Sequence, residues 1–373
     1  MALSLSPKAR RNIGKVLPYG IIWLGTGWLF VFAEEAATAG LRQIPDTVIE
    51  LSFPVMVFAS IAVFAVGILV GIIELVWLED AFKERSFSQK LFLKVGIYLL
   101  IMTAIIAVTY PVAASLEEGL SFLDKTIWQR FGDYLQSINF LSTLIQMAFS
   151  LFLCFFYSGI SANVGHGVLL NFFTGKYHTP QVENRIFMFL DMKSSTTLAE
   201  RLGHTRYFSL LSKYYASLSD DIIRYEGEVY QYIGDEVVIS WKSEKGLAHA
   251  NCINCFFAMR KTLTKKGDTF EKKFGYRPEF KAGLHLGDVT TGEIGALKRE
   301  IFFTGDVLNV TARIQSLCNQ FEKDLLVSEK LVHLLPEHHG FPTAFLGRYM
   351  LKGRKEAVGI YAVEEGPEMV SQK

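Results

Sequence analysis

Four long apolar runs in the first half of this chain constrain its fold more than any other feature of the sequence. A helix needs about 20 predominantly apolar residues to cross the hydrocarbon core of a bilayer. Three of the runs reach that length without a charged residue, and a shorter run precedes them: residues 17–33, 51–73, 95–115 and 137–165. The sequence therefore predicts an all-α four-helix transmembrane domain over residues 1–157, with the lipid membrane as its partner.

The first run has an alternative interpretation, because it is shorter than the others and lies close to the N-terminus. A cleavable signal peptide would also place an apolar segment there. However, Trp23 and Trp28 lie within the run and the acidic pair Glu34 and Glu35 follows it, which is not typical of a cleaved segment. We therefore interpret the first run as a membrane span.

Basic residues indicate how the four spans are oriented. They cluster before the first span and between the second and third, at Lys8, Arg10, Arg11, Lys15, Lys83, Arg85, Lys90 and Lys94. Because Lys and Arg are retained on the cytoplasmic side, we expect an integral plasma (inner) membrane protein with its N-terminus and its second half in the cytoplasm.

Glu34, Glu35 and Glu74 lie at or near span ends. Carboxylates inside a membrane are functional candidates, but at these positions we expect interfacial solvation.

Charge and cysteine content exclude two classes of protein. The formal net charge is only +1, so the chain lacks the basic surface of a nucleic-acid-binding protein. Four cysteines are too few for a disulfide framework. Cys252 and Cys255 form a C-x-x-C pair inside a segment with helical periodicity, and we expect two small core residues one turn apart.

Residues 158–183 connect the two halves and are predicted to form a helical linker or transducing element. Apolar residues between 168 and 173 are able to continue the last span, and Gly175 and Pro180 then end any helix. A passive linker and a signalling element both remain open.

From residue 184 the pattern changes to alternating strands and helices. Residues 185–191 predict a buried strand, the Ser and Thr residues at 194–197 predict a capped helix start, and residues 228–241 predict a hairpin around a Gly-Asp turn. Later helices and strands follow in the same style to residue 363. The second half is therefore predicted to be an α+β or α/β domain, residues 184–366 with a tail at 367–373, whose helices cover one sheet face.

Two acidic residues in this half are candidates for binding hard cations. Asp191 ends an apolar strand, and Asp235 lies in the tight turn of the following hairpin. Magnesium prefers one or two carboxylates together with phosphate oxygens. The helix start at Ser195 and Thr196 offers free backbone N–H groups to such phosphates. Taken singly, each aspartate is also typical of a turn or cap residue.

Five motifs in order raise the specificity of this pattern: FMFLDMKSST, YIGDEVVISW, AGLHLGDVTTGEIG, TGDVLNVTARI and LKG. Together they resemble the class III adenylyl and guanylyl cyclases over about residues 184–364. The resemblance implies a ferredoxin-like βαββαβ core with extra strands, and an enzyme that forms a 3′,5′-cyclic nucleotide. In this family each active site forms between two catalytic domains, so the resemblance also implies a homodimer.

The resemblance assigns catalytic roles residue by residue. Asp191 and Asp235 match the aspartates that hold two Mg²⁺ or Mn²⁺ ions, and the backbone carbonyl of Met192 matches a further ligand. Asn309 and Arg313 lie one helical turn apart and match the pair that orients the ribose and stabilises charge on the α-phosphoryl group. The aspartates of a site would come from one subunit, and Asn309 and Arg313 from the other.

The substrate contacts depart from the family pattern. Lys352 in the short LKG motif matches a lysine that binds the triphosphate. Where adenylyl cyclases usually have Lys and Asp or Thr to read the base, this chain has Gln231 and Phe302. A Gln amide can face either purine, whereas Phe302 would leave the polar groups that distinguish guanine unsatisfied. We therefore expect ATP as substrate, with loose base selection.

Three alternative functions share parts of this pattern, and the third is excluded by its motif. A guanylyl cyclase would share the mechanism, and a membrane receptor could use a silent cyclase-like domain for dimerisation. A diguanylate-forming enzyme should show a Gly-Gly-Asp/Glu-Glu-Phe hairpin, which YIGDEV is not. The membrane domain could also receive an unknown ligand or protein, which the sequence does not identify.

Overall fold

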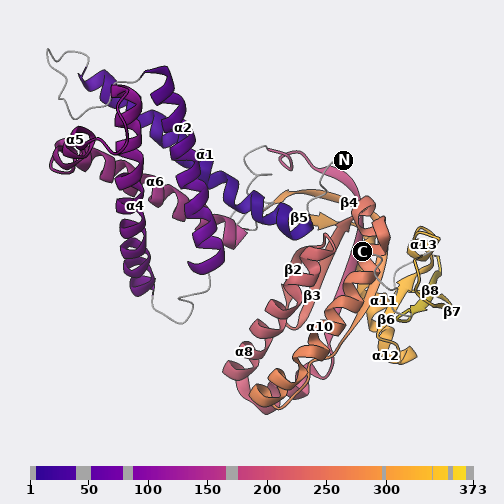
Figure 1. The fold of residues 1–373 in the computed structure, drawn as a ribbon. Coiled ribbons are helices and arrows are strands. Elements are labelled where there is room, and N and C mark those ends of the chain that lie inside the picture. The colour runs from indigo at the N-terminus through magenta and orange to yellow at the C-terminus, as the bar shows by residue number, and fades with distance from the viewer. Residues whose placement is uncertain are drawn as a thin grey trace. The chain divides into compact units, whose positions relative to one another are not determined.

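The computed structural model describes residues 6–38, 52–78, 87–164, 175–295, 300–337, 339–351 and 356–366. It divides the chain into two compact units, Ala9–Leu170 and a unit built on Asn171–Lys373 with Met1–Lys8. Each unit is described by itself (Figure 1). The predicted tail lies outside the described residues, as does part of the predicted linker.

The first unit is helical and agrees with the predicted spans. Within the described part of the chain, four helices are long and apolar enough to cross a membrane: Pro7–Ala36, Phe53–Leu78, Gly96–Glu118 and Phe140–Ser161. The unit consists of α1 (Pro7–Thr38), α2 (Phe53–Ile73), a π-helical turn η1 (Glu74–Leu78), α4 (Phe87–Glu118), α5 (Lys125–Leu135) and α6 (Ile138–Val164). The amphipathic helix α5 was not expected from the sequence.

Helices α1 and α2 pack closely because both carry glycine at the contact. A Cβ atom on Gly67 would lie 2.6 Å from the carbonyl oxygen of Tyr19 and 2.8 Å from Cα of Gly20. Small residues allow helix backbones to approach closely in membranes, where packing rather than water exclusion drives association. A larger residue at Gly67 would push the two helices apart.

Glu74 differs from its expected interfacial solvation. Its side chain is buried, forms an ion pair with Lys94, and accepts a 3.0 Å hydrogen bond from the hydroxyl of Tyr98. The expectation was wrong because the sequence does not reveal that α4 places a cation and a hydroxyl opposite the end of α2. Glu34 and Glu35 are exposed, in agreement with their expected solvation.

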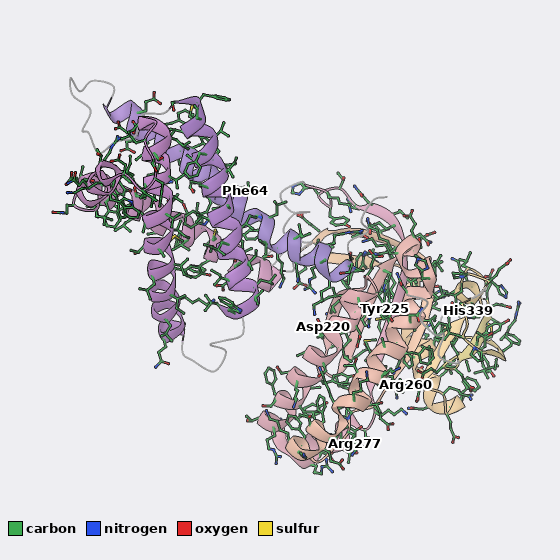
Figure 2. All side chains as sticks on the ribbon, in the orientation of Figure 1. Phe64, Asp220, Tyr225, Arg260, Arg277 and His339 are labelled. Atoms are coloured by element: carbon green, nitrogen blue, oxygen red, sulfur yellow. The ribbon has the colours of Figure 1, made fainter. Side chains whose placement is uncertain are left out.

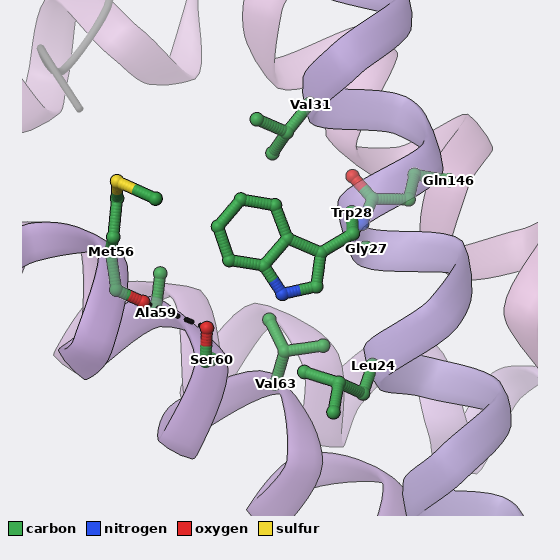
Figure 3. A pocket seen from close by; sticks show the side chains of 9 residues that line it. All are labelled: Leu24, Gly27, Trp28, Val31, Met56, Ala59, Ser60, Val63 and Gln146. Carbon is green, nitrogen blue, oxygen red and sulfur yellow. Dashed lines mark hydrogen bonds between the residues drawn. The ribbon is translucent and has the colours of Figure 1, made fainter.

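A pocket of 160 Å³ also lies in the helical unit. Figure 3 shows the Trp28 indole among side chains from α1 and α2, with Ser60 Oγ donating a 2.8 Å hydrogen bond to the carbonyl oxygen of Met56. The lining is apolar except for Ser60 and Gln146 of α6. A ligand for this unit stays a prediction.

The second unit is built on a mixed sheet of order β2-β3-β1-β4-β6-β8-β7, with β5 paired to β4. Strands β2, β3, β1 and β4 are antiparallel neighbours and form the predicted βαββαβ core with α8 and α10. The strands are β1 (Gln181–Met192), β2 (Glu228–Ile233), β3 (Glu236–Lys242), β4 (Phe280–Ile294), β5 (Glu300–Thr304), β6 (Leu325–Ser328), β7 (Thr343–Tyr349) and β8 (Val358–Val363). The helices are α8 (Ser195–Arg224), α9 (Ser243–Leu247), η2 (Ala248–Ala250), α10 (Asn251–Phe274), α11 (Asp306–Ser316), α12 (Cys318–Phe321) and α13 (Glu329–Val332).

The two sheet faces are covered differently. Even-numbered residues of β1, such as Met188 and Leu190, pack in one apolar cluster with α8 and α10, whose ribbons lie side by side in Figure 1. Odd-numbered residues, such as Phe187 and Phe189, pack with Val307 of α11 on the opposite face. The expectation of helices on one face therefore holds for α8 and α10 but not for α11.

Helix α10 confirms the prediction for the cysteine pair. Cys252 and Cys255 are free thiols, both fully buried in the apolar cluster. The outer surface of the helix is polar: Arg260, labelled in Figure 2, lies 4.8 Å from the ring of Phe257 and pairs with Glu365 near the chain end. The C-x-x-C spacing thus reflects core packing.

Candidate active site

Asp191 and Asp235 come together at one end of the sheet. Strand β1 pairs with β3 up to Leu190 and Val237, which places Asp191 beside the turn that carries Asp235. Burial raises the pKa of Asp191, and the neighbouring Asp235 raises it further. Two carboxyl groups this close repel each other when both are ionised. The site therefore concentrates negative charge in a half-buried position.

The carboxyl group of Glu236 lies close enough to Asp191 and Asp235 to be affected by their charges. Burial raises the pKa of Glu236 to about 7, and the charges of Asp191 and Asp235 add to the effect. Even so, no group of three or more His, Cys, Asp or Glu side chains in the described ranges is placed to hold a metal ion. A cation here would be held by two aspartates, with remaining ligands from backbone or substrate, as the sequence predicted.

A carboxylate oxygen of Asp235 without a hydrogen-bond partner suits a divalent cation. Oδ2 of Asp235 is buried and accepts no hydrogen bond from any residue that the structure describes. A buried carboxylate oxygen without a partner costs free energy, and a hard cation that takes oxygen ligands would satisfy it. The donor set therefore suits Mg²⁺ or Mn²⁺.

Lys281 belongs to the site but was missed from the sequence. Its Nζ lies 3.2 Å from Oδ2 of Asp191 and donates a 2.9 Å hydrogen bond to Oδ1 of Asn319. It lowers the pKa of Asp191, against burial and Asp235. The signal was a lysine near the start of a strand whose next residues are mostly apolar. Its role depends on the register of β1 and β4, which pairs Asp191 with Lys281.

The helix start after β1 differs in detail from its prediction. The side chain of Met192 is buried, Ser195 is half-buried and Thr196 is exposed at the start of α8. Ser194 precedes the helix at φ 57° and makes no side-chain capping hydrogen bond. The predicted cap is wrong because the chain turns through the left-handed region there, which directs the hydroxyl away from the N–H groups of the first turn.

Lys193 is held away from the helix start. Its Nζ pairs with Asp324 at 2.7 Å and with Glu279 at 3.4 Å. The ammonium group of Lys193 therefore pairs with Glu279 and Asp324 and does not add its positive charge to the start of α8.

Asn309 and Arg313 share one face of α11, as their spacing predicts. The opposite face of the helix carries the buried residues that pack on the sheet: Val307, Val310, Thr311, Ile314 and Gln315. Contact with the sheet is close, because Gly283 of β4 leaves no space for a side chain against Gln315. Asn309 is exposed, and neither it nor Arg313 forms a side-chain hydrogen bond or ion pair with another described residue.

The start of α11 also lies far along the sheet from the aspartates. A Cβ atom on Gly287 would contact Val307 at 3.1 Å, and Gly287 pairs with Arg185, six residues before Asp191 in β1. At about 3.3 Å per residue this is about 20 Å along the strand. Within one chain, Asn309 projects away from the sheet and is not brought to Asp191.

The residues predicted to contact the base lie on two outer strands. Gln231 of β2 is exposed, beside a bulge at Val229 and Gln231. Phe302 of β5 is 44% exposed. Lys352 lies outside the described residues.

Comparisons with known proteins bear on the whole second unit. A family model described as the adenylate and guanylate cyclase catalytic domain matches residues 178–365. Adenylate cyclase 2 of Rhizobium meliloti is 34% identical over 203 residues, which cover 54% of this chain and 56% of that protein. The adenylate cyclase of Anabaena cylindrica is 26% identical over 184 residues, which cover 48% of this chain and 36% of that protein. The chain thus spans about half or less of the length of these relatives.

A solved structure shares the fold. The structure of a bacterial light-regulated adenylyl cyclase has a TM-score of 0.51 and 23% sequence identity, over 61% of this chain and 64% of that chain. At this identity the likeness concerns the fold alone. It agrees with the ferredoxin-like core and the additional strands described above.

Proposed function

Because this chain belongs to the family of adenylate and guanylate cyclase catalytic domains, we propose that it is a membrane-anchored, homodimeric adenylate cyclase. The ribose 3′-oxygen of ATP attacks the α-phosphorus and loses its proton, the bond to the β-phosphate oxygen breaks, and the products are 3′,5′-cyclic AMP and pyrophosphate. The four apolar helices anchor it in the plasma (inner) membrane, with the N-terminus and the catalytic unit in the cytoplasm.

One observation carries this proposal: the two aspartates converge, and Oδ2 of Asp235 is buried without a hydrogen-bond partner among the described residues. Asp191, Asp235 and the carbonyl of Met192 would hold two Mg²⁺ or Mn²⁺ ions. When bound, these ions supply activation of the 3′-hydroxyl and neutralisation of the triphosphate.

The chain's own side chains complete the site from a second copy. Asn309 of that copy orients the ribose, and the guanidinium of Arg313 stabilises the charge that develops on the α-phosphoryl group. In their own chain both side chains lie on the helix face opposite the buried residues that pack on the sheet, which is consistent with a role in the site of the other copy. This separation supports two shared sites in a homodimer.

Remaining residues bind the nucleotide. Backbone N–H groups at Ser195 and Thr196 face the phosphates at the start of α8, where the helix dipole favours negative charge. Lys352 would bind the triphosphate, and Gln231 and Phe302 contact the adenine. Phe302 is exposed in the single chain, so its ring is free to stack on the adenine ring of the substrate.

Product formation by the purified full-length protein tests the proposal. ATP and GTP are supplied together with Mn²⁺ or Mg²⁺, and cyclic products are separated by chromatography. Cyclic AMP in clear excess is expected. Predominant cyclic GMP would contradict the assignment of the base, and a folded dimer without either product would favour a silent receptor. Regulation through the membrane unit predicts that activity changes when that unit binds its ligand.

A further inference from the structure

Arg185 is a buried charge that the proposed catalytic roles do not use. It lies in β1 on the α11 side of the sheet and is only 2% exposed. Its Nη2 donates a 2.6 Å hydrogen bond to Glu228, its Nε lies 3.7 Å from Glu183, and its guanidinium lies 4.7 Å from the centre of the Phe303 ring. Arginine is rarely this buried unless paired, so its contacts indicate a specific role.

These contacts connect three strands. Arg185 and Glu183 belong to β1, Glu228 to β2 and Phe303 to β5. Among the strands that the structure describes, β2 is an edge of the sheet and β5 pairs only with β4, so neither is held from both sides. A planar guanidinium can bond carboxylates in its plane and stack on a ring with its face. Arg185 therefore braces two strands that are otherwise weakly held.

A second contact joins the same two strands directly. The N–H of Phe303 donates a 3.3 Å hydrogen bond to Oη of Tyr230, and the two rings lie 4.7 Å apart. Arg185, Tyr230 and Phe303, together the Arg185 clamp, thus form one packed group between β2 and β5. Moving any member displaces the backbone of both strands.

The residues next to the clamp are the two proposed base contacts. Gln231 follows Tyr230, and Phe302 precedes Phe303. Because side chains alternate along a strand, burying Phe303 against Arg185 turns Phe302 outward, where it is exposed. The clamp therefore fixes both the spacing of β2 and β5 and the direction of Phe302.

We propose that Arg185 is a positioning residue for base recognition: it holds the β2 and β5 segments that present Gln231 and Phe302 to the purine. This inference rests on the proposed function, since it assigns the base contacts to those two residues. Arg185 does not touch the aspartates or Asn309, so its removal should weaken base binding more than the chemical step.

The decisive variant is Arg185→Met in the full-length protein, which keeps the side-chain length but removes the charge and the planar group. Its partners tolerate the loss, because Glu228 is largely exposed and Glu183 keeps contacts to Tyr177 and Thr291. Arg277→Met is the matched control, since Arg277 also pairs with two carboxylates but lies beyond the end of α10 (Figure 2). Arg185→Lys tests whether charge alone suffices.

For Arg185→Met we expect the KM for ATP to rise about tenfold while kcat changes less than about threefold, as for a lost pocket contact. The ratio of kcat/KM for the two nucleotides should move towards equality. Arg277→Met should match the wild type, and Arg185→Lys should recover little of the loss. An unchanged KM and an unchanged ATP-to-GTP ratio, or full recovery with lysine, would overturn the proposal.

Two further measurements keep the result interpretable. Tyr230→Phe removes only the hydroxyl that accepts a hydrogen bond from the N–H of Phe303. It should raise the KM for ATP with normal folding, even if Arg185→Met misfolds. An unchanged KM would contradict the clamp.

Binding of N-methylanthraniloyl ATP and GTP in the presence of Mn²⁺ reports base preference without turnover. A wild type that binds but forms no cyclic product would refute the proposed function, while the effect of Arg185→Met on binding still decides the clamp.

Discussion

The two faces of the catalytic sheet differ in what they bury. On the face covered by α8 and α10, one continuous apolar cluster extends over β1, β3 and β4, from Ile186 to Leu286. On the α11 face the apolar residues form two smaller clusters, and charged or polar groups lie in the strands themselves: Arg185, Asp191, His285 and Lys281. Burying such groups costs free energy of folding. The α11 face is therefore expected to contribute less to stability than the face covered by α8 and α10.

This contrast predicts how substitutions on the two faces should differ in effect. The α8 and α10 face provides the hydrophobic free energy that holds the unit together. The α11 face carries charged side chains in its strands, such as Lys281 beside Asp191, that a ligand can contact. A substitution on the first face should lower stability, and one on the second should lower activity with little loss of stability.

The largest expected effect follows from Asp191→Ala or Asp235→Ala. Turnover should fall by about 10³-fold or more, the scale on which losing a preorganised electrostatic group lowers kcat. Because burial and Asp235 raise the pKa of Asp191, the native state binds that proton more tightly than the unfolded state, and ionised Asp191 opposes folding at neutral pH. The Tm should therefore stay near the wild-type value.

Activity assays and thermal unfolding in detergent check this prediction. Asp268→Ala is the control, because Asp268 is an exposed carboxylate on α10. Residual turnover near the wild-type level in either site variant would contradict the cation site. A large drop in Tm would instead place these aspartates among the stabilising residues.

Phe256→Ala should produce the opposite pattern. Phe256 of α10 is fully buried and packs edge-to-face on Phe257 and Phe280. Removing its ring should cost about 3–5 kcal/mol and lower the Tm by roughly 10 °C, with kcat unchanged at temperatures where the protein stays folded. Phe208→Ala, at a 73% exposed position on α8, should leave the Tm unchanged. A loss of kcat without a loss of stability would contradict the proposed difference between the faces.

The smallest effect is expected at Ser194, where the chain leaves β1 and enters α8. Its φ of 57° is unfavourable for a residue with a Cβ. Ser194→Gly should therefore raise stability by less than about 1 kcal/mol, because the gain is partly offset by the greater freedom of the unfolded chain. Thr197→Gly, inside the first turn, should destabilise by a similar amount. A lower Tm for Ser194→Gly would show that the serine side chain stabilises this turn.

Local patterns predicted much of this architecture from the sequence. The apolar runs are long enough to identify four spans. The alternation of strands and helices predicted a mixed α and β domain, and the resemblance to the class III cyclases implied its βαββαβ core. The Asp191 motif and the Asp235 turn were recognisable because each is a short contiguous segment. In the same way, the spacing of Asn309 and Arg313 placed them on one helix face.

Contacts between distant segments could not be predicted from the sequence. Lys281 was missed because its pairing with Asp191 depends on strand register. The burial of Glu74 depends on Lys94 and Tyr98 of another helix. The Arg185 clamp joins β1, β2 and β5, and strand β5 itself was not expected. In each case the meaning of the residue depends on a partner that periodicity does not identify.

Mixing two inactive variants tests most directly the central claim that two copies of the α11 face form each active site. Asp191→Ala and Arg313→Ala chains are denatured and refolded together, or co-expressed with different tags and purified as mixed dimers. Random pairing on refolding places one intact site in half of the dimers, so about a quarter of wild-type activity should return. Purified mixed dimers each have one intact site of two and should recover about half, although each variant alone is inactive. Proven mixed dimers without any activity would contradict the shared site.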